Sequence, residues 1–228
     1  MGKNGPSVLY EDNHLIIVNK RASDLVQGDS TGDEPLDAAV KQYIREKYNK
    51  PGDVFLGVVH RLDRPVSGCV IYARTSKALT RLSELFRTRD VKKSYWAIVT
   101  ECPPAEEGVL RNFLKKNEQQ NKSYVYDKEV KGSKEATLSY RIIGRSSSFY
   151  LVEIDLQTGR HHQIRAQLAA AGCPVRGDLK YGSKRSNEGG GISLHARRIS
   201  FVHPVKKEEI NVEAPLPDDK VWRLFAGI

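Results

Sequence analysis

The segment HRLDRPVSG, from His60 to Gly68, places one carboxylate, Asp63, between two arginine side chains. Neighbouring positive charge favours the ionised form of a carboxyl group, and a guanidinium group hydrogen-bonds an acid directionally. Flanked by Arg61 and Arg64, Asp63 is therefore a candidate nucleophile. The segment is equally rich in turn residues, so Asp63 could instead accept hydrogen bonds from local backbone amides, and the spacing alone favours neither role.

Four blocks of the sequence, taken together, resemble a known family. HRLDRPVSG is similar to the catalytic signature of the RluA family of pseudouridine synthases, in which HRLD is followed within a few residues by SG. Three more blocks match in the family's order: Lys92–Val99, Thr158–Gly182 and Leu194–Pro204. The resemblance covers nearly the whole chain from Leu9 onward. Val66 departs from it, because the family often has threonine there, and this affects local hydrogen bonding rather than the chemistry.

The resemblance implies roles for three residues in catalysis. Asp63 would be the essential residue, and Arg165 would pair with it while leaving one carboxylate oxygen free to attack. Tyr95 matches the family's active-site tyrosine, expected to stack on the target uracil and a candidate for handling a proton. Without the resemblance, Arg165 could instead project from its helix into solvent, and the sequence around Tyr95 favours a core aromatic.

The resemblance also implies contacts with RNA. The target base must leave the stack of a structured RNA, and Arg61 matches the position expected to fill the gap, where a planar guanidinium can stack and bind phosphate. Candidate phosphate contacts are Arg64, Arg160, His162 and Lys180, although each could be an ordinary surface charge. His161 and His162, expected on a helix, would point about 100° apart and could not chelate one metal from one face.

The implied reaction moves the sugar bond from N1 to C5 of uracil in specific uridines of ribosomal or transfer RNA. Such an isomerisation needs no metal, redox cofactor or nucleotide energy source, and the sequence contains neither GxxxxGK[ST] nor GxGxxG nor a zinc-deaminase pattern. Whether Asp63 attacks C6 of the base or C1′ of the ribose stays open. Two other classes remain: a non-catalytic RNA-binding or ribosome-associated protein, and a hydrolase that uses Asp63 with a histidine.

Composition sets the broad class. A chain of 228 residues with 39% hydrophobic residues is long enough for a single domain with its own core, and we expect residues 1–8 to be flexible. The 37 Lys and Arg against 28 Asp and Glu give a net charge of +9, which favours a polyanionic partner, although many ordinary basic proteins reach this value. Many family members carry an N-terminal S4-type domain, and here the catalytic blocks begin near residue 1, so we expect target choice to come from the catalytic domain.

Cysteine content and hydropathy point to the cytoplasm. The three cysteines are far apart and form no CxxC pair, so neither a disulfide framework nor a zinc site is indicated. The sequence has no apolar run of about 18 residues and no signal-peptide core. A myristoylation motif is ruled out because Pro6 stands where serine or threonine is needed. We expect a cytoplasmic monomer without a membrane anchor.

The candidate residues must be positioned by strands and helices. Phe55–His60 and Gly68–Arg74 are predicted strands on either side of the Asp63 segment, and Leu15–Lys20 is a predicted buried strand. A helix is expected from Pro35 to about Asn49, and another after the cap residue Thr75, with the apolar stripe Leu79, Leu82, Leu85 and Phe86.

The second half of the chain reads mainly as strands. Residues 94–100 alternate as a half-buried strand, residues 136–144 and 149–156 form a hairpin, and residues 194–204 and 209–215 are closing strands. Residues 161–172 are expected to form a helix that ends at Gly172. Residues 101–132 are either an inserted hairpin that touches RNA or a solvated loop, and their polarity favours the loop. The resemblance implies an α+β pseudouridine synthase fold, with a central, mainly antiparallel mixed sheet flanked by helices and an active-site cleft.

Overall fold

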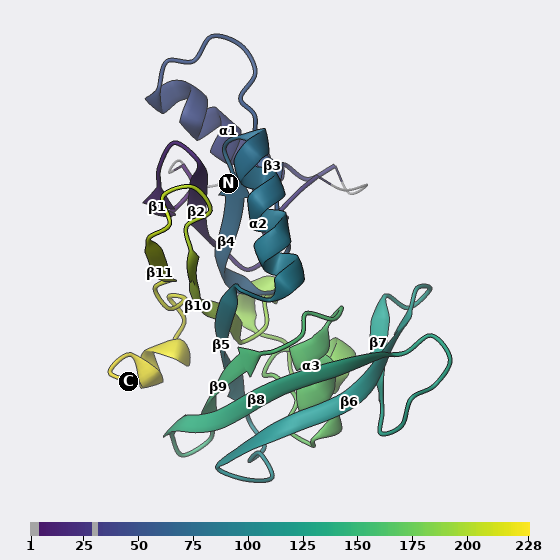
Figure 1. Cartoon of the computed structure of the whole chain (residues 1–228). Helices are drawn as coiled ribbons and strands as arrows, with labels where there is room; N and C mark the ends of the chain where they lie inside the picture. The colour runs from purple at the N-terminus through teal and green to yellow at the C-terminus, as the bar shows by residue number, and fades with distance from the viewer. Residues whose placement is uncertain (1–4, 29–31) are drawn as a thin grey trace. The chain divides into compact units, whose positions relative to one another are not determined.

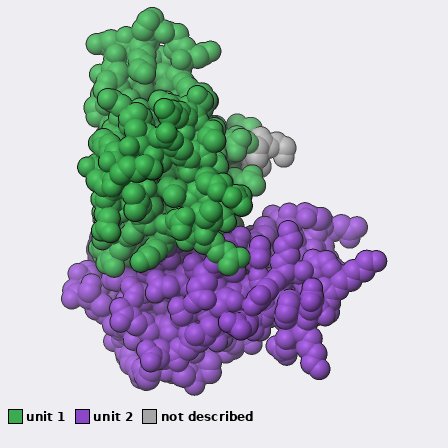
Figure 2. All heavy atoms as spheres, viewed as in Figure 1, with its two compact units in different colours: residues 1–92, 196–215 green, residues 93–195, 216–228 purple. Residues whose placement is uncertain are grey.

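The computed structural model describes residues 5–28 and 32–228. The chain comprises two compact units, coloured separately in Figure 2: unit 1 contains residues 1–92 and 196–215, and unit 2 contains residues 93–195 and 216–228. Of the stretch predicted to be flexible, residues 1–4 lie outside the described part of the chain, and a strand begins at Val8. The single-domain assignment stays a prediction.

Unit 1 is built on an antiparallel sheet centred on β2 and β4. The two strands pair from Leu15 opposite Ala73 to Lys20 opposite Gly68, while β1 pairs with β2, β3 with β4 and β10 with β11. Its elements are β1 (Val8–Glu11), β2 (Leu15–Lys20), α1 (Leu36–Lys47), β3 (Gly57–Val58), β4 (Ser67–Ala73), α2 (Ser76–Thr88), β10 (Leu194–Val202) and β11 (Glu209–Glu213) (Figure 1). The part of β10 from Ala196 onward belongs to unit 1. The predicted strands are confirmed, although the one before Asp63 is only two residues long.

Both predicted helices of unit 1 are confirmed, with their caps and buried faces. α1 follows Pro35 and buries Leu36, Val40 and Ile44. The Thr75 hydroxyl accepts a hydrogen bond from the Ala78 amide at 3.1 Å, which satisfies one free donor at the start of α2. Leu82 of α2 is fully buried in a cluster with residues of β2, β4 and β10, and such burial contributes roughly 2 kcal/mol. These helices hold the sheet from which the Asp63 segment projects.

Gly68 explains how the Asp63 segment returns to the sheet. Its φ of +114° belongs to a region that side-chain-bearing residues rarely adopt, and a Cβ there would collide with the backbone of Ala196 in β10. Glycine is therefore required both for the backbone conformation and for the close approach of the neighbouring strand.

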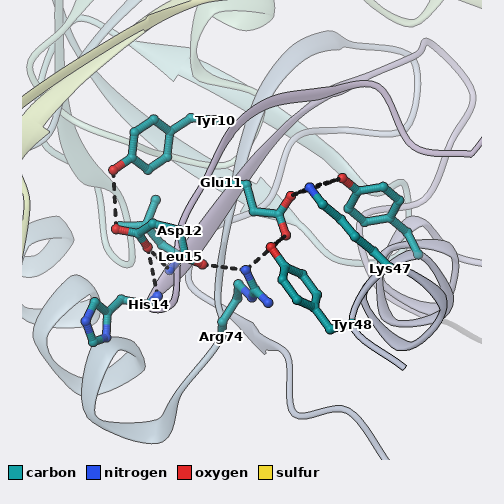
Figure 3. A network of polar contacts seen from close by, with 9 residues as sticks. Tyr10, Glu11, Asp12, His14, Leu15, Lys47, Tyr48 and Arg74 are labelled. Atoms are coloured by element: carbon teal, nitrogen blue, oxygen red, sulfur yellow. Dashed lines mark hydrogen bonds and ion pairs between the residues drawn. The ribbon is translucent and has the colours of Figure 1, made fainter. Parts of the chain in front are cut away.

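A polar network surrounds the buried carboxylate of Glu11, at the end of β1 (Figure 3). Its carboxylate accepts hydrogen bonds from Arg74 at 2.9 Å, from Lys47 at 2.6 Å and from Tyr48 at 2.8 Å, and a further one comes from Tyr43. Burial alone would raise the pKa of Glu11, but these donors together lower it below its usual 4.5. The network ties α1 and the end of β4 to the first strand of unit 1.

Unit 2 contains an antiparallel sheet in the order β5-β9-β8-β6-β7. Its strands are β5 (Lys92–Val99), β6 (Glu107–Asn117), β7 (Lys122–Tyr126), β8 (Lys134–Arg145) and β9 (Tyr150–Leu156), and its helix is α3 (Gln163–Ala170). Short 3-10 turns occupy Leu179–Tyr181, Glu188–Gly190 and Trp222–Phe225. The antiparallel character expected of the fold and the predicted hairpin of residues 136–156 are confirmed.

The two faces of this sheet are covered by different segments. Directly opposed residues of antiparallel strands share a face, which places Tyr95, Ile154 and Tyr140 in one row. Further along that face, α3 packs on β6 and β8 through Ala166. On the other face, Trp96 packs against the C-terminal Trp222. The expectation of a half-buried β5 was wrong, because both faces are covered there and residues 95–99 are all buried.

Residues 101–132 form a hairpin rather than the loop that their polarity favoured. β6 and β7 pair from Phe113 opposite Tyr126 to Asn117 opposite Lys122. The sequence hides the strands because charged side chains stand among the aromatic ones on the outward face, and only Leu114 and Ser123 of the paired segment are buried, on the side of α3. The preference for a solvated loop was therefore wrong.

Candidate active site

The Asp63 loop, residues 59–66, connects β3 to β4 and is anchored at several points. The ring of His60 stacks on Phe86 of α2 with centroids 4.8 Å apart, and its Nε2 accepts a hydrogen bond from the Ile71 amide of β4 at 3.0 Å. The Val66 amide donates to the Asp63 carbonyl at 3.0 Å, which closes a turn around the candidate nucleophile. The loop backbone is thus fixed, while the Asp63 side chain is half-buried.

Lys20, at the end of β2, lies fully buried against this loop. Its ammonium group donates to three backbone carbonyl oxygens, two of which belong to the loop: Val66 at 2.6 Å and Arg64 at 3.0 Å. Burial lowers the pKa of Lys20 to about 8, although the carboxylates of Asp24 and Asp63 act in the opposite direction. An ammonium group has three N–H donors, so the protonated form matches the three carbonyls.

The two arginines that flank Asp63 are exposed. Arg64 forms an ion pair with Asp33, at 2.6 Å between Nη2 and Oδ2. The sequence places two arginines beside Asp63, and the structure adds the buried ammonium group of Lys20, which also interacts electrostatically with Asp63. Arg61 stays available at the surface for the role predicted for it.

Tyr95 lies on the α3 face of the unit 2 sheet and is 8% exposed. Lys93 stands two residues earlier on the same strand and face, and burial lowers its pKa. The Lys93 ammonium lies beside Gly159, whose Cβ, if present, would be 3.7 Å from Nζ. The α3 face therefore carries a half-buried cation next to the candidate tyrosine.

Arg165 is buried within α3, and its side chain is held by Asp178. The two form a bidentate pair, with Nε to Oδ2 at 2.6 Å and Nη2 to Oδ1 at 2.9 Å, and both side chains are at most 6% exposed. The guanidinium also lies 5.1 Å from the ring centroid of Tyr181. Paired and packed in this way, Arg165 keeps a fixed orientation, which rules out the reading of a solvent-exposed helix residue.

A hydrogen-bond network fixes Tyr181 in turn. The Ser123 amide of β7 donates to the Tyr181 hydroxyl at 2.8 Å, and Nδ1 of His162 lies 2.9 Å from the same oxygen. His162 is 9% exposed, and burial, followed by the charge of Arg165, lowers its pKa to about 3. His162 is therefore neutral near pH 7, and its position favours packing over a phosphate contact.

His162 and His161 precede α3 instead of lying on it. The helix starts at Gln163 because His162 adopts a left-handed φ of 53°, and the two imidazole rings stack at a centroid distance of 3.8 Å. The expected divergence of about 100° is therefore wrong. The predicted end of the helix is confirmed, since Gly172 follows with a positive φ.

The remaining candidate cations contact backbone oxygens. Arg160 donates through Nε to the Glu135 carbonyl at 2.8 Å. Lys180 is exposed and lies 3.2 Å from the carbonyl of Asn121, in the turn between β6 and β7. Both are close to the surface of unit 2, and their contacts with RNA stay predictions.

Two absences hold for the part of the chain that the structure describes. Within residues 5–28 and 32–228, no group of three or more His, Cys, Asp or Glu side chains is arranged to hold a metal ion. Over the same residues, no helix is both long and apolar enough to cross a membrane.

The predicted site residues are divided between the units. Asp63, Arg61 and Arg64 belong to unit 1, whereas Tyr95 and Arg165 belong to unit 2. The ion pair between Asp63 and Arg165 would link the two units, and it stays a prediction.

Sequence reasoning missed Lys20 and Asp178. A lysine that ends the apolar run LIIVNK is a signal for a buried cation, and Asp178 is the only carboxylate between Thr158 and Gly182. Both signals were present in the sequence, but the partner of each residue is visible only in three dimensions.

The fold is that of a pseudouridine synthase. Two solved structures superpose on nearly the whole chain: human RNA pseudouridylate synthase domain containing 4, with a TM-score of 0.81, 24% identity and coverage of 96% of this chain and 92% of the other, and human RNA pseudouridylate synthase domain containing 1, with a TM-score of 0.74, 21% identity and coverage of 93% and 84%. At these identities the likeness concerns the fold, and it agrees with the predicted α+β class.

Sequence comparison defines the family. The sequence model for RNA pseudouridylate synthase matches residues 14–170. Ribosomal large subunit pseudouridine synthase C of Buchnera aphidicola (strain APS) is 34% identical over 93% of this chain and 68% of its own length. Ribosomal large subunit pseudouridine synthase D of Xanthomonas campestris is 32% identical, over 97% and 69%. The chain spans about two thirds of the length of these relatives and belongs to the RNA pseudouridine synthase family of isomerases.

Proposed function

We propose that the protein isomerises specific uridines in structured RNA, with Asp63 as the nucleophile. One carboxylate oxygen of Asp63 attacks C6 of uracil or C1′ of the ribose, the N1–C1′ bond breaks, and the base turns within the site. C5 then bonds C1′, the bond to Asp63 breaks, C5 loses its proton and N1 gains one. The observation that carries this proposal is the Asp63 loop itself. Its backbone is fixed by the buried ammonium of Lys20 and by the ring of His60, while the carboxylate remains half-buried.

Arg165 and Tyr95, both of unit 2, are proposed to act together with Asp63. We assign to Arg165 the charge interaction with Asp63, supported by the way in which Asp178 orients its guanidinium. We assign to Tyr95 the stacking contact with the target uracil, supported by its place on the α3 face. An arginine that is already paired needs little reorganisation when a carboxylate approaches it.

The RNA contacts follow from charge and exposure. Arg61 is exposed and is proposed to fill the gap left by the flipped base, because its planar guanidinium can stack between neighbouring bases. Arg64, Arg160 and Lys180 are proposed phosphate contacts, with His162 the weakest candidate because it is buried and neutral.

We propose ribosomal RNA as the substrate, in preference to transfer RNA. The relatives in Buchnera and Xanthomonas are named for the large ribosomal subunit, and a net charge of +9 suits a polyanion.

We propose a cytoplasmic monomer. The free cysteines Cys69, Cys102 and Cys173 agree with a reducing compartment.

The test is formation of pseudouridine on ribosomal and transfer RNA transcripts, mapped by position, with wild type and Asp63→Asn. The asparagine keeps the shape of the side chain but cannot act as a carboxylate nucleophile, so we expect no product from a variant that still folds and binds RNA. Measurable turnover by purified Asp63→Asn would contradict the mechanism. A wild-type protein that binds RNA but forms no pseudouridine on any transcript would favour the non-catalytic alternative.

A further inference from the structure

The hairpin of β6 and β7 presents two faces of different character. Paired residues share a face, so Tyr126 lies beside Phe113, and Tyr124 lies beside Lys115. The opposite face packs on α3, where Leu114 and Val125 join a core cluster. In Figure 1, β6 and β8 cross in front of α3, so the face with the tyrosines is the one turned away from the helix.

The outward face of the hairpin exposes aromatic rings. Tyr124 is 39% exposed and Tyr126 is 38% exposed, while Phe113, on β6 opposite Tyr126, is partly buried. On the same side of the sheet, the C-terminal residues Trp222 and Phe225 cover Trp96 at the far end, on β5. The uncovered aromatic surface is therefore confined to the hairpin, which we name the hairpin face: Phe113, Lys115, Lys122, Tyr124 and Tyr126.

Positive charge accompanies these rings. The ammonium of the half-buried Lys122 lies between two rings, 5.6 Å from the centroid of Tyr124 and 5.1 Å from that of Tyr181 on the α3 side. Lys115 is exposed beside the ring of Tyr124. Basic residues outnumber acidic ones between residues 107 and 134: Arg111, Lys115, Lys116, Lys122, Lys128, Lys131 and Lys134 against Glu107, Glu118, Asp127 and Glu129. The hairpin thus combines aromatic faces with a local excess of cations.

We propose that the hairpin face binds an unpaired segment of the RNA substrate, a proposal that rests on the proposed function. One base stacks on Tyr124 and another on Tyr126, while the ammonium groups of Lys115 and Lys122 contact phosphates. The two tyrosines are separated by one residue along the strand, about 7 Å, so each ring serves its own base. Every base has an aromatic face, so this contact adds affinity without reading sequence.

Charge and chemistry favour unpaired RNA over the alternatives. In a duplex the base faces are covered by neighbouring bases, so exposed tyrosine rings would have nothing to stack on. The cores of protein interfaces are depleted of lysine, whereas here Lys115 and Lys122 border the rings. A polyanion whose base faces are free satisfies both features.

The experiment measures fluorescence anisotropy of a labelled, uridine-rich single-stranded RNA of about 12 nucleotides with the full chain. Replacing both tyrosines (Tyr124→Ala with Tyr126→Ala) should weaken binding by about tenfold or more, through lost stacking. Replacing both with phenylalanine keeps the rings and should keep wild-type affinity. The matched control is Phe55→Ala, which removes a 47% exposed ring from unit 1. The same variants should bind a duplex of this sequence as wild type does.

Each outcome supports or overturns the proposal. Unchanged affinity of the double alanine variant would overturn it, and so would an equal loss in the phenylalanine variant or on the duplex. If the alanine variant fails to fold, Tyr124→Trp provides a second measurement, since Trp96 and Trp222 are buried and only the new indole can be quenched by stacking bases. Absence of quenching on binding would also overturn the proposal.

Pseudouridine formation by the same wild-type preparation separates this proposal from the proposed function. Tyrosine-dependent binding without pseudouridine would contradict the proposed function alone. Normal pseudouridine formation with tyrosine-independent binding would contradict the hairpin face alone.

Discussion

Asp63 and Arg165 are the two charged groups proposed to act together, yet the protein holds them in opposite ways. Asp63 is half-buried on a loop, and Lys20 binds the backbone carbonyls of that loop. Arg165 is 5% exposed, and Asp178 binds its guanidinium directly. A nucleophile must change its bonding during the reaction, whereas a charge partner only has to stay in place. Fixing the backbone in one case and the side chain in the other fits this difference.

After Asp63→Asn, the largest effect should come from the arginine side of this comparison. Arg165→Met removes the charge proposed to pair with Asp63, and we expect kcat to fall roughly a thousandfold. Asp178→Asn leaves Arg165 in place with one weakened bond and a less compensated charge, so we expect a smaller fall, about tenfold to a hundredfold, and a lower thermal midpoint. Single-turnover rates of pseudouridine formation and thermal unfolding would measure both.

Arg141→Met is the matched control for these variants. Arg141 lies on the other face of the unit 2 sheet, is 64% exposed and pairs with Glu153. Its loss should leave kcat near the wild-type value, since exposed ion pairs contribute little. A larger loss in Asp178→Asn than in Arg165→Met would mean that Asp178 acts in catalysis by itself and does not simply position Arg165.

On the aspartate side, Lys20→Met should reduce kcat by about a hundredfold. The loop would lose the donor that holds the carbonyls of Arg64 and Val66, and a displacement of about 1 Å at a reacting group can cost that much. Substrate affinity should change less, since Lys20 is fully buried. Lys50→Met, an exposed position in unit 1, is the control. An unaltered kcat would show that the loop keeps its geometry without the hydrogen bonds from Lys20.

The rate should also depend on pH through the hydrogen bonds that Lys20 donates to the loop carbonyls. As pH rises through about 8, Lys20 loses its proton, and a neutral amine has two N–H donors for three carbonyls. We therefore expect kcat to fall on the alkaline side with a midpoint near pH 8. The folded-state pKa is lowered, so between about 8 and 10.5 the unfolded chain binds more protons at this site, and the stability contribution of Lys20 increases with pH.

A falling rate without a matching loss of stability distinguishes this deprotonation from alkaline unfolding. Rates and unfolding midpoints measured at the same pH values would show it. A rate that stays flat well above pH 8 would contradict a role for the protonated lysine.

Features that depend on neighbouring residues could be predicted from the sequence, whereas contacts between distant residues could not. The cap at Thr75, the buried strand Leu15–Lys20 and the end of α3 at Gly172 depend on neighbouring residues, and all three are confirmed. The carbonyls bound by Lys20 lie 44 and 46 residues further along the chain, which no local pattern reveals. The strands β6 and β7 were missed because charged side chains stand among the aromatic ones on their outward face.

The candidate site was predictable by residue type and less so by contact. The four sequence blocks nominated Asp63, Tyr95 and Arg165, but they did not reveal that Arg64 pairs with Asp33 or that Lys20 binds the Asp63 loop from within. The partner of Arg165 within unit 2, Asp178, follows a turn 13 residues later, where only the folded chain brings the two together. Long-range contacts between charged groups thus account for most of what sequence reasoning could not supply.

The smallest effect on activity should come from a buried ion pair outside the site, which tests whether the comparison concerns catalysis or burial in general. Glu11 and Arg74 have side chains only 7% and 6% exposed, much like the pair of Arg165 and Asp178. Glu11→Gln leaves Arg74 and Lys47 without a full countercharge, so we expect the free energy of unfolding to fall by roughly 3 kcal/mol while kcat stays unchanged at temperatures where the variant is folded.

The stabilisation by the Glu11 carboxylate should also depend on pH and be lost in acid. The folded-state pKa of Glu11 lies below 4.5, so its stabilisation is present above that value and is lost as pH falls through the lowered pKa. The difference in stability between wild type and Glu11→Gln should therefore shrink in acid, which denaturant unfolding at neutral and acidic pH would measure. If Glu11→Gln instead lowered kcat as Asp178→Asn does, burial of charge alone would account for both effects, and the special position of Asp178 beside Arg165 would lose its support.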